Sequence, residues 1–157
     1  MKILLLIMAN TDEEYLKIGI KNYNEKINRY YSFSITEIAA LKNIKNISFE
    51  LQKEKEADAI LQKINVSDYV ILLDENGKEF TSEKFAKQLQ LNFNKGLKSI
   101  VFIVGGPFGF GKKLLERGNE KMALSQMTFS HQMVRLFFTE QLYRACTIIK
   151  GEKYHHI

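Results

Sequence analysis

The apolar residues of this chain gather in four short runs, and these runs constrain the fold more than any other feature. The runs are rich in β-branched residues and read KILLLIM (2–8), FSITEI (33–38), YVILLD (69–74) and SIVFIV (99–104). Short apolar runs of this composition are typical of buried strands. Segments of helical spacing separate them, and strands that alternate with helices form a mainly parallel sheet with helices on both faces. We therefore predict an α/β fold.

The segments between the runs predict the helices. The first is marked by apolar side chains near helical spacing: Tyr15, Ile18, Tyr23, Ile27 and Tyr30. Thr11 or Asp12 can cap its start. Residues 48–64 are mostly charged, which predicts an exposed helix. Asn76-Gly77 predicts a turn after the third run, and Thr81 or Ser82 can begin a further helix.

Length and composition favour one domain over residues 1–157, with no repeat or linker. Cys146 is the only cysteine, so no internal disulfide can form and a reducing, cytoplasmic compartment is expected. Acidic residues follow the first apolar run without a cleavage pattern, so we interpret this run as a strand. No apolar stretch approaches the roughly 20 residues of a spanning helix, which excludes a membrane protein.

Positive charge is concentrated in the second half of the chain. Residues 79–157 carry 12 Lys and Arg against 6 Asp and Glu, whereas residues 1–78 carry 11 against 12. A basic half-chain suits a polyanionic partner such as RNA. Because 19 of the 23 basic residues are lysines, a surface of solvated lysines explains the same pattern.

The segment VGGPFGFGKK (104–113) follows the fourth run directly. Four glycines and Pro107, the only proline, lie within the seven residues 105–111. Glycine lets the backbone approach a ligand closely, and ligands of parallel sheets bind at the carboxyl ends of the strands. We predict that this glycine loop (residues 105–111) cradles a cofactor, although an ordinary strand-to-helix turn is the simpler alternative.

Familiar nucleotide and metal motifs do not fit the chain. Gly106–Lys113 resembles a P-loop, but Lys113 stands where the metal-binding Ser or Thr belongs. A dinucleotide fingerprint would need glycine at Leu114. His155 and His156 are adjacent without cysteine or acidic companions, so we expect no metal site.

The C-terminal segment predicts a helix that Ser130 caps and that runs to about Cys146. Its apolar residues cover more than one stripe, so the helix must bury two faces. The simplest partner for the second face is another copy of the chain, which predicts a homodimer. The tail GEKYHHI either frays or folds back over a pocket, where it would bring a phenol and an imidazole.

Three segments, in order and at matching spacing, resemble the ribosomal RNA large-subunit methyltransferase H family of the SPOUT class. They are IVFIVGGPFGFG (100–111), LSQMTFSHQMVRLFFTEQLYRA (124–145) and GEKYHH (151–156). LDENGKEFTSEKFA (73–86) and the N-terminal strand and helix also match, so the resemblance covers the whole chain. Two places depart from the family pattern. His156 stands where many members have arginine, and Met8–Thr11 stands where members often have Gly-Lys.

The resemblance implies a C-terminal trefoil knot, a homodimer, and S-adenosylmethionine-dependent methylation of N3 of a pseudouridine in 23S ribosomal RNA of assembled ribosomes. It also implies cofactor contacts, largely from the backbone, at Leu73, Gly105, Leu124, Ser125, Gln126, Met127, Thr128 and Phe129. Catalysis would fall to Tyr154 and His155 in the tail.

The basic residues provide the candidates for RNA contact. Lys112 and Lys113 follow the glycine loop, and Arg135 and Arg144 lie on the predicted C-terminal helix, where side-chain pairing is an equal alternative. Two other functions stay open from the sequence: a non-enzymatic RNA-binding or ribosome-assembly protein, and a SPOUT methyltransferase that acts on transfer RNA.

Overall fold

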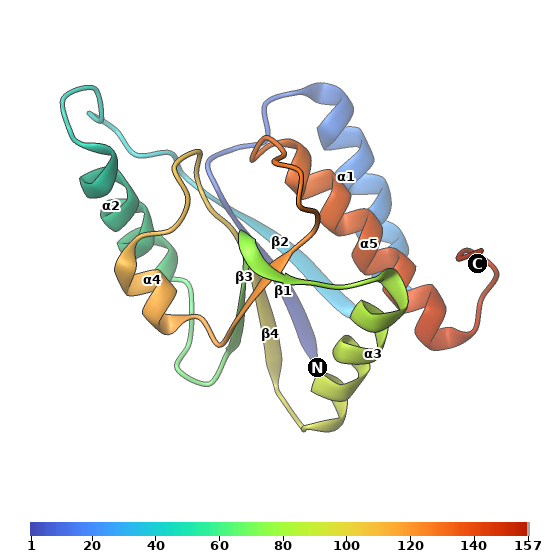
Figure 1. The fold of residues 1–157 in the computed structure, drawn as a ribbon. Helices are drawn as coiled ribbons and strands as arrows, with labels where there is room; N and C mark the ends of the chain where they lie inside the picture. The colour runs from blue at the N-terminus through green and yellow to red at the C-terminus, as the bar shows by residue number, and fades with distance from the viewer. Residues whose placement is uncertain (157) are drawn as a thin grey trace.

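A single five-stranded sheet forms the centre of the computed structural model, which describes residues 1–156 (Figure 1). The strands are β1 (Lys2–Met8), β2 (Ser32–Ile38), β3 (Tyr69–Glu79), β4 (Ser99–Val104) and β5 (Glu120–Ala123). Their order across the sheet is β2-β1-β4-β3-β5, and every neighbouring pair is parallel. The predicted α/β fold with a parallel sheet is confirmed.

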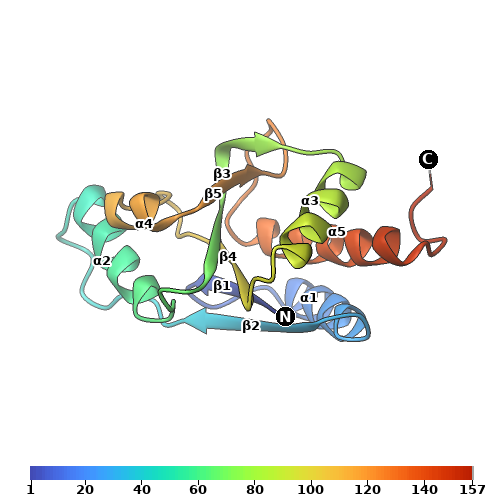
Figure 2. The same cartoon turned by 90° about the horizontal axis from the view of Figure 1, so that it is seen from below.

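Helices cover both faces of the sheet. They are α1 (Glu14–Ile27), α2 (Phe49–Leu61), α3 (Ser82–Asn94), α4 (Lys112–Arg117) and α5 (Met133–Lys150). Figures 1 and 2 show α2 and α4 on one face and α1, α3 and α5 on the other. No helix of residues 1–156 is both long enough and apolar enough to cross a membrane.

Two hydrophobic cores result from this arrangement. Ile3, Leu5 and Ile7 of β1 pack into the core under α1, α3 and α5. Leu6 and Met8, on the same strand, pack into the core under α2 and α4. Successive side chains of a strand point to opposite faces, so a strand buried on both sides is apolar at every position. This explains why the strands are continuous apolar runs in the sequence.

The predicted turn at Asn76-Gly77 is wrong, because β3 continues through it to Glu79. The pairing of β3 with β5 shifts register between Leu73 and Lys78. A methyl group on Gly77 would lie 2.5 Å from the backbone nitrogen of Met122, so glycine allows β5 to approach closely at this bulge.

The start of α1 also differs from the prediction. Neither Thr11 nor Asp12 caps it, because Glu13 occupies the capping position without a side-chain hydrogen bond. Ile27 is buried as predicted, but Tyr15 and Ile18 are more than 60% exposed, and Leu16 and Ile20 complete the buried face of α1. The predicted apolar stripe is therefore wrong at the start of this helix and right at its end.

The start of α3 follows the prediction, whereas Gln132 and not Ser130 occupies the capping position of α5. Thr81 Oγ1 accepts a hydrogen bond from the Lys84 backbone nitrogen, and Ser130 Oγ accepts one from that of Met133. Helix α5 extends past Cys146 to Lys150 and ends at Gly151, whose φ of 70° is the left-handed conformation that glycine favours.

Candidate functional site

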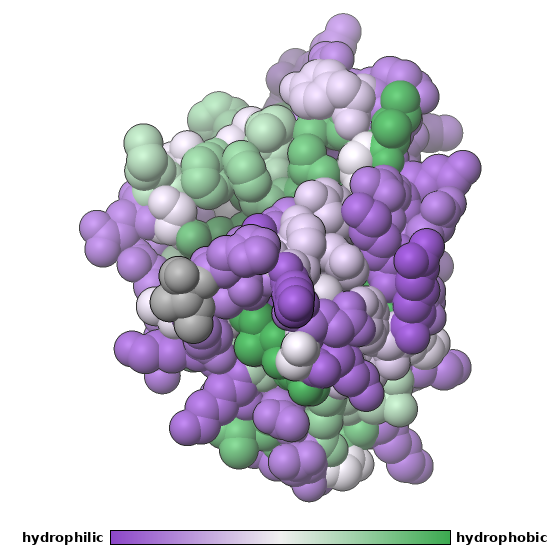
Figure 3. Space-filling model, turned by 90° about the vertical axis from the view of Figure 1, so that its right-hand side faces the viewer, coloured by the Kyte–Doolittle hydropathy of each residue, from purple (hydrophilic) through white to green (hydrophobic). Residues whose placement is uncertain are grey.

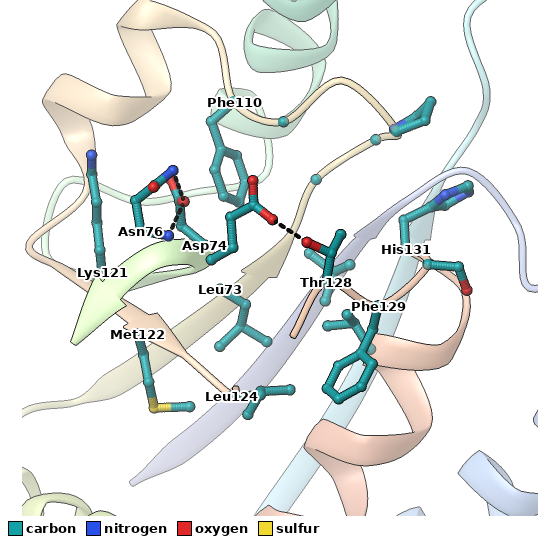
Figure 4. A pocket seen from close by; sticks show the side chains of 18 of the residues that line it. Leu73, Asp74, Asn76, Phe110, Lys121, Met122, Leu124, Thr128, Phe129 and His131 are labelled. Atoms are coloured by element: carbon teal, nitrogen blue, oxygen red, sulfur yellow. Dashed lines mark hydrogen bonds between the residues drawn. The ribbon is translucent and has the colours of Figure 1, made fainter. Parts of the chain in front are cut away.

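A cavity of about 600 Å³ lies at the carboxyl ends of β3, β4 and β5 (Figure 4). Its size falls within the range of about 300–1,000 Å³ that is usual for small-molecule sites. Ligands of open parallel sheets bind at this end of the strands. The cavity is therefore the candidate functional site of the chain.

The glycine loop forms one wall of this cavity, as its position after β4 predicted. The Gly109 nitrogen donates to the Gly106 carbonyl at 3.2 Å, which closes the loop on itself. Gly109 has a φ of 84°, a conformation that other residues rarely adopt. The loop therefore presents a compact stretch of backbone to the cavity.

The segment between β5 and α5 forms the facing wall. The cavity is lined by seven of the eight predicted cofactor residues: Leu73, Gly105, Leu124, Ser125, Met127, Thr128 and Phe129. Gln126 is not among the lining residues, because its amide points to Glu79 Oε2 at 3.4 Å.

Polar groups of the β3 bulge also lie at the cavity, although they were not among the residues expected to contact the cofactor. Thr128 Oγ1 donates to Glu75 Oε2 at 3.0 Å, and the Asn76 backbone nitrogen donates to Asp74 Oδ1 at 2.9 Å (Figure 4). The first bond ties the 124–129 segment to β3, and the second shapes the bulge. Both carboxylates lie at the cavity, so they favour a ligand that carries hydroxyl groups or positive charge.

His131 also lines the cavity, and no sequence motif pointed to it. Burial, together with the nearby guanidinium of Arg135, lowers the pKa of the His131 imidazole below its usual range. The ring is therefore neutral at neutral pH.

Arg135 corrects one of the predicted RNA contacts. Its side chain is fully buried and donates to the Met8 carbonyl at 2.8 Å, to Thr11 Oγ1 at 2.9 Å and to the His131 carbonyl at 3.1 Å. The guanidinium cannot reach a phosphate from there. It instead joins the end of β1 to the start of α5, beside the cavity.

The other three basic candidates lie closer to solvent. The Lys112 side chain is largely exposed at the start of α4, and Lys113 pairs with Asp58 at 2.7 Å. Arg144 is bound by Glu140 Oε1 on its own helix, so side-chain pairing occupies most of its donors. None of the three lines the cavity.

The predicted catalytic tail does not reach the cavity of its own chain. Val134 lines the cavity, whereas the tail packs on Arg144, which lies ten residues further along α5, or roughly 15 Å at the usual helical rise. Figure 1 shows the tail beyond the far end of α5. The structure therefore separates Tyr154 and His155 from the predicted cofactor residues.

Tyr154 is held by hydrogen bonds and aromatic contacts. Its hydroxyl donates to Glu140 Oε1 at 3.0 Å and lies 3.5 Å from the Tyr23 hydroxyl. Its ring packs edge-on against Tyr143 and lies 4.7 Å from the Arg144 guanidinium. Burial, followed by the bonds with Tyr23 and Glu140, raises the pKa of Tyr154 well above its usual range. The phenol is therefore a hydrogen-bond donor and not a base at neutral pH.

Both ring nitrogens of His155 are engaged. Nε2 lies 2.6 Å from Glu83 Oε1, and Nδ1 lies 3.3 Å from Nη1 of Arg144. Arginine can only donate, so Nδ1 accepts and the proton sits on Nε2, which donates to Glu83. The bond from His155 lowers the pKa of Glu83 to about 2. In this conformation His155 has no free nitrogen with which to take a proton.

Residues 1–156 contain no group of three or more His, Cys, Asp or Glu side chains placed to hold a metal ion.

Comparison with known proteins decides the family. The family model described as "Predicted SPOUT methyltransferase" matches residues 1–155. The chain belongs to the SPOUT methyltransferase family. The resemblance drawn from the glycine loop, the 124–145 segment and the tail is thereby confirmed.

Curated relatives of this SPOUT methyltransferase match it along its length. A protein of Flavobacterium psychrophilum is 51% identical over 156 residues, and one of Christiangramia forsetii is 49% identical, each match covering 99% of both chains. A protein of Cytophaga hutchinsonii is 48% identical, with 99% of this chain and 100% of the relative covered. All three are named ribosomal RNA large subunit methyltransferase H.

Proposed function

We propose that this protein methylates N3 of a pseudouridine in large-subunit ribosomal RNA, with S-adenosylmethionine as the methyl donor and the assembled ribosome as the substrate. The observation that carries the proposal is the cavity at the carboxyl ends of β3, β4 and β5, lined by seven residues expected to contact the cofactor. Relatives over the whole length are named as methyltransferases of large-subunit ribosomal RNA. Such a protein acts in the cytoplasm, where bacterial ribosomes are.

The residues of the cavity fit S-adenosylmethionine. Leu73, Met122 and Leu124 supply an apolar wall for an adenine ring (Figure 4). The backbone of the glycine loop can approach the ligand closely. The carboxylates of Asp74 and Glu75 suit its hydroxyl groups and its positive charge. An apolar lining with a few polar groups is the usual composition of a cofactor site.

S-adenosylmethionine supplies a methyl carbon bound to a positively charged sulfur, which makes the methyl group reactive without further activation. Bound in the cavity, it would give this methyl group to N3 and leave as S-adenosylhomocysteine, and the N3 proton would pass to a proton acceptor or to water. The protein must mainly hold the pseudouridine ring in line with the methyl group. Such positioning can lower the activation barrier by roughly 7–11 kcal/mol. The glycine loop and the 124–129 segment would position the cofactor for this transfer.

The tail carries the candidate groups for the acceptor side. We assign the orientation of the target base to Tyr154, whose protonated phenol and aromatic face suit stacking. We assign acceptance or relay of the N3 proton to His155. Since both of its ring nitrogens are bonded in the packed tail, Nδ1 must first leave Arg144. The packed tail is thus a resting arrangement.

A homodimer would bring this tail to a cavity. The sequence suggested that α5 buries its second apolar face against another copy of the chain. Within the chain, however, α1 and α3 already pack against α5. Exposed hydrophobic side chains nevertheless remain on this part of the molecule: Tyr15 and Ile18 on α1, Phe137 on α5, and Met127. Figure 3 shows hydrophobic patches on the face seen from the α1, α3 and α5 side. We propose that two copies pair through these residues, with the knotted C-terminal regions implied by the family at the contact.

The function is tested by offering different acceptors to the purified protein with methyl-labelled S-adenosylmethionine. Assembled ribosomes should be labelled at N3 of a pseudouridine in 23S ribosomal RNA, as located by mass spectrometry of nuclease fragments. Free ribosomal RNA and transfer RNA should be labelled far less. Labelling of transfer RNA alone would assign the protein to the alternative SPOUT activity. Ribosome binding without labelling would make it a non-enzymatic binding protein.

A further inference from the structure

Glu56 is a buried carboxyl group that the proposed methyl transfer does not use. It lies on α2 and is only 6% exposed. Gln52 Nε2 donates to its Oε1 at 3.0 Å, whereas its Oε2 is buried without a hydrogen-bond partner in the described structure. A buried carboxylate that lacks a cation is strongly unfavourable, so these surroundings favour the uncharged acid. Burial correspondingly raises the pKa of Glu56.

The charged residues around Glu56 are paired with other groups or exposed to solvent. Those on α2 and on α4, which packs against it, are Glu50, Lys53, Glu54, Lys55, Asp58, Lys112, Lys113, Glu116 and Arg117. Lys55 is exposed, and Arg117 donates to the backbone carbonyls of Asn65 and Asp68. Lys53 pairs with Glu50, Lys113 with Asp58, and Lys112 with Glu116, while Glu54 accepts from the Lys112 backbone nitrogen. Strand β1, which also contacts α2, carries charge only at its first residue, Lys2. Glu56 therefore has no ion-pair partner among these groups.

The carboxyl group of Glu56 lies directly behind the glycine loop. A methyl group on Gly106 would be 2.5 Å from Oε2 and 2.9 Å from Cδ of Glu56, so only glycine fits there. Two further contacts join α2 to the same loop. A methyl group on Gly111 would be 2.7 Å from the Lys53 carbonyl, and the Phe108 ring stacks on Phe49 with centroids 4.1 Å apart. Helix α2 thus supports the loop on the side away from the cavity.

We propose that Glu56 is a positioning residue for the cofactor: its uncharged carboxyl group supports Gly106 from behind and keeps the glycine loop in the shape that binds S-adenosylmethionine. This inference rests on the proposed function for the identity of the ligand. Ionisation would place a charge against the loop backbone in a site that has no cation to balance it, so the loop would have to move. Cofactor affinity should therefore be highest at low pH and should fall as the pH rises through the pKa of Glu56.

Calorimetric titration of S-adenosylhomocysteine, the demethylated product, tests this role from about pH 4.5, where an ordinary glutamate titrates, to about pH 9. Glu56→Ala should weaken binding at least about tenfold, because a loop shifted by an ångström loses its contacts. Glu56→Gln keeps the volume and cannot ionise. It should bind S-adenosylhomocysteine about as well as the wild type at low pH, and its affinity should not fall as the pH rises. Comparing Glu56→Gln with the wild type at each pH cancels the effect of the ligand's own titration on the measured affinity.

Glu50→Gln is the matched control, because Glu50 lies on the same helix, is exposed and pairs only with Lys53. It should keep both the affinity and the pH dependence of the wild type. If the wild type binds and Glu56→Ala binds equally well, the positioning role is wrong and the proposed function stands. If Glu56→Ala does not fold, a wild-type pH profile in Glu56→Gln overturns the role. A wild type that does not bind overturns the cofactor assignment itself.

Discussion

Replacing His155 with alanine is expected to slow methyl transfer to ribosomes by about 10²–10⁴-fold, the usual contribution of a positioned acid or base. Cofactor affinity should stay unchanged, because the proposed role of His155 is on the acceptor base, and the walls assigned to the cofactor are the glycine loop and the 124–129 segment. Single-turnover rates with labelled S-adenosylmethionine measure the first effect, and calorimetry measures the second. His156→Ala is the matched control, since His156 is the exposed neighbour. Equal rates for both variants and the wild type would contradict the role of His155 in the reaction.

Mixing two inactive variants shows whose cavity the tail serves. His155→Ala has an intact cavity, and Ser125→Trp has a filled cavity with an intact tail. In mixed dimers a tail that acts on the partner restores one complete site, so random exchange should regain about a quarter of the wild-type activity. A tail that acts within its own chain restores none. Sedimentation at micromolar concentration should confirm that each protein is a dimer.

Replacing Arg135 with alanine should lower the free energy of unfolding by about 3–5 kcal/mol. The change empties a buried volume and leaves the Met8 carbonyl and the Thr11 hydroxyl without their donor. This is a large share of the roughly 5–15 kcal/mol that stabilises an ordinary domain. Urea denaturation followed by circular dichroism measures it.

Arg29→Ala is the control for charge removal, because Arg29 is exposed just after α1. Its effect should stay within about 0.5 kcal/mol. Loss of RNA binding without loss of stability in Arg135→Ala would contradict the structural role assigned to this residue. It would instead favour the phosphate contact expected from the sequence.

The sheet was predictable from the sequence where burial alone decides the pattern. The strands β1, β2 and β4 are short apolar runs bounded by polar segments, and their predicted ends lie within one residue of the observed ends. The strand β5 was not predicted, because Glu120 and Lys121 give it no apolar run. It exists through its pairing with β3, where Gly77 lets the backbones approach. Such pairing depends on residues far apart in the sequence.

The candidate site was predictable to a similar degree. The glycine loop and the 124–129 segment were identified from composition and family resemblance, and the structure brings them to one cavity. Glu75 and His131 were missed, since their place depends on the bulge in β3 and on the turn before α5. Local patterns offered Arg135 equally as an RNA contact and as a partner in side-chain pairing. Its burial depends on acceptors at Met8 and Thr11, more than 120 residues away.

The central claim is that the cavity between the glycine loop and the 124–129 segment holds the methyl donor. Adding S-adenosylhomocysteine to isotope-labelled protein and following the backbone amide signals by nuclear magnetic resonance tests it most directly. Saturable shifts are expected to be concentrated in residues 104–110 and 124–129. An unchanged spectrum, or shifts confined to another surface, would contradict it.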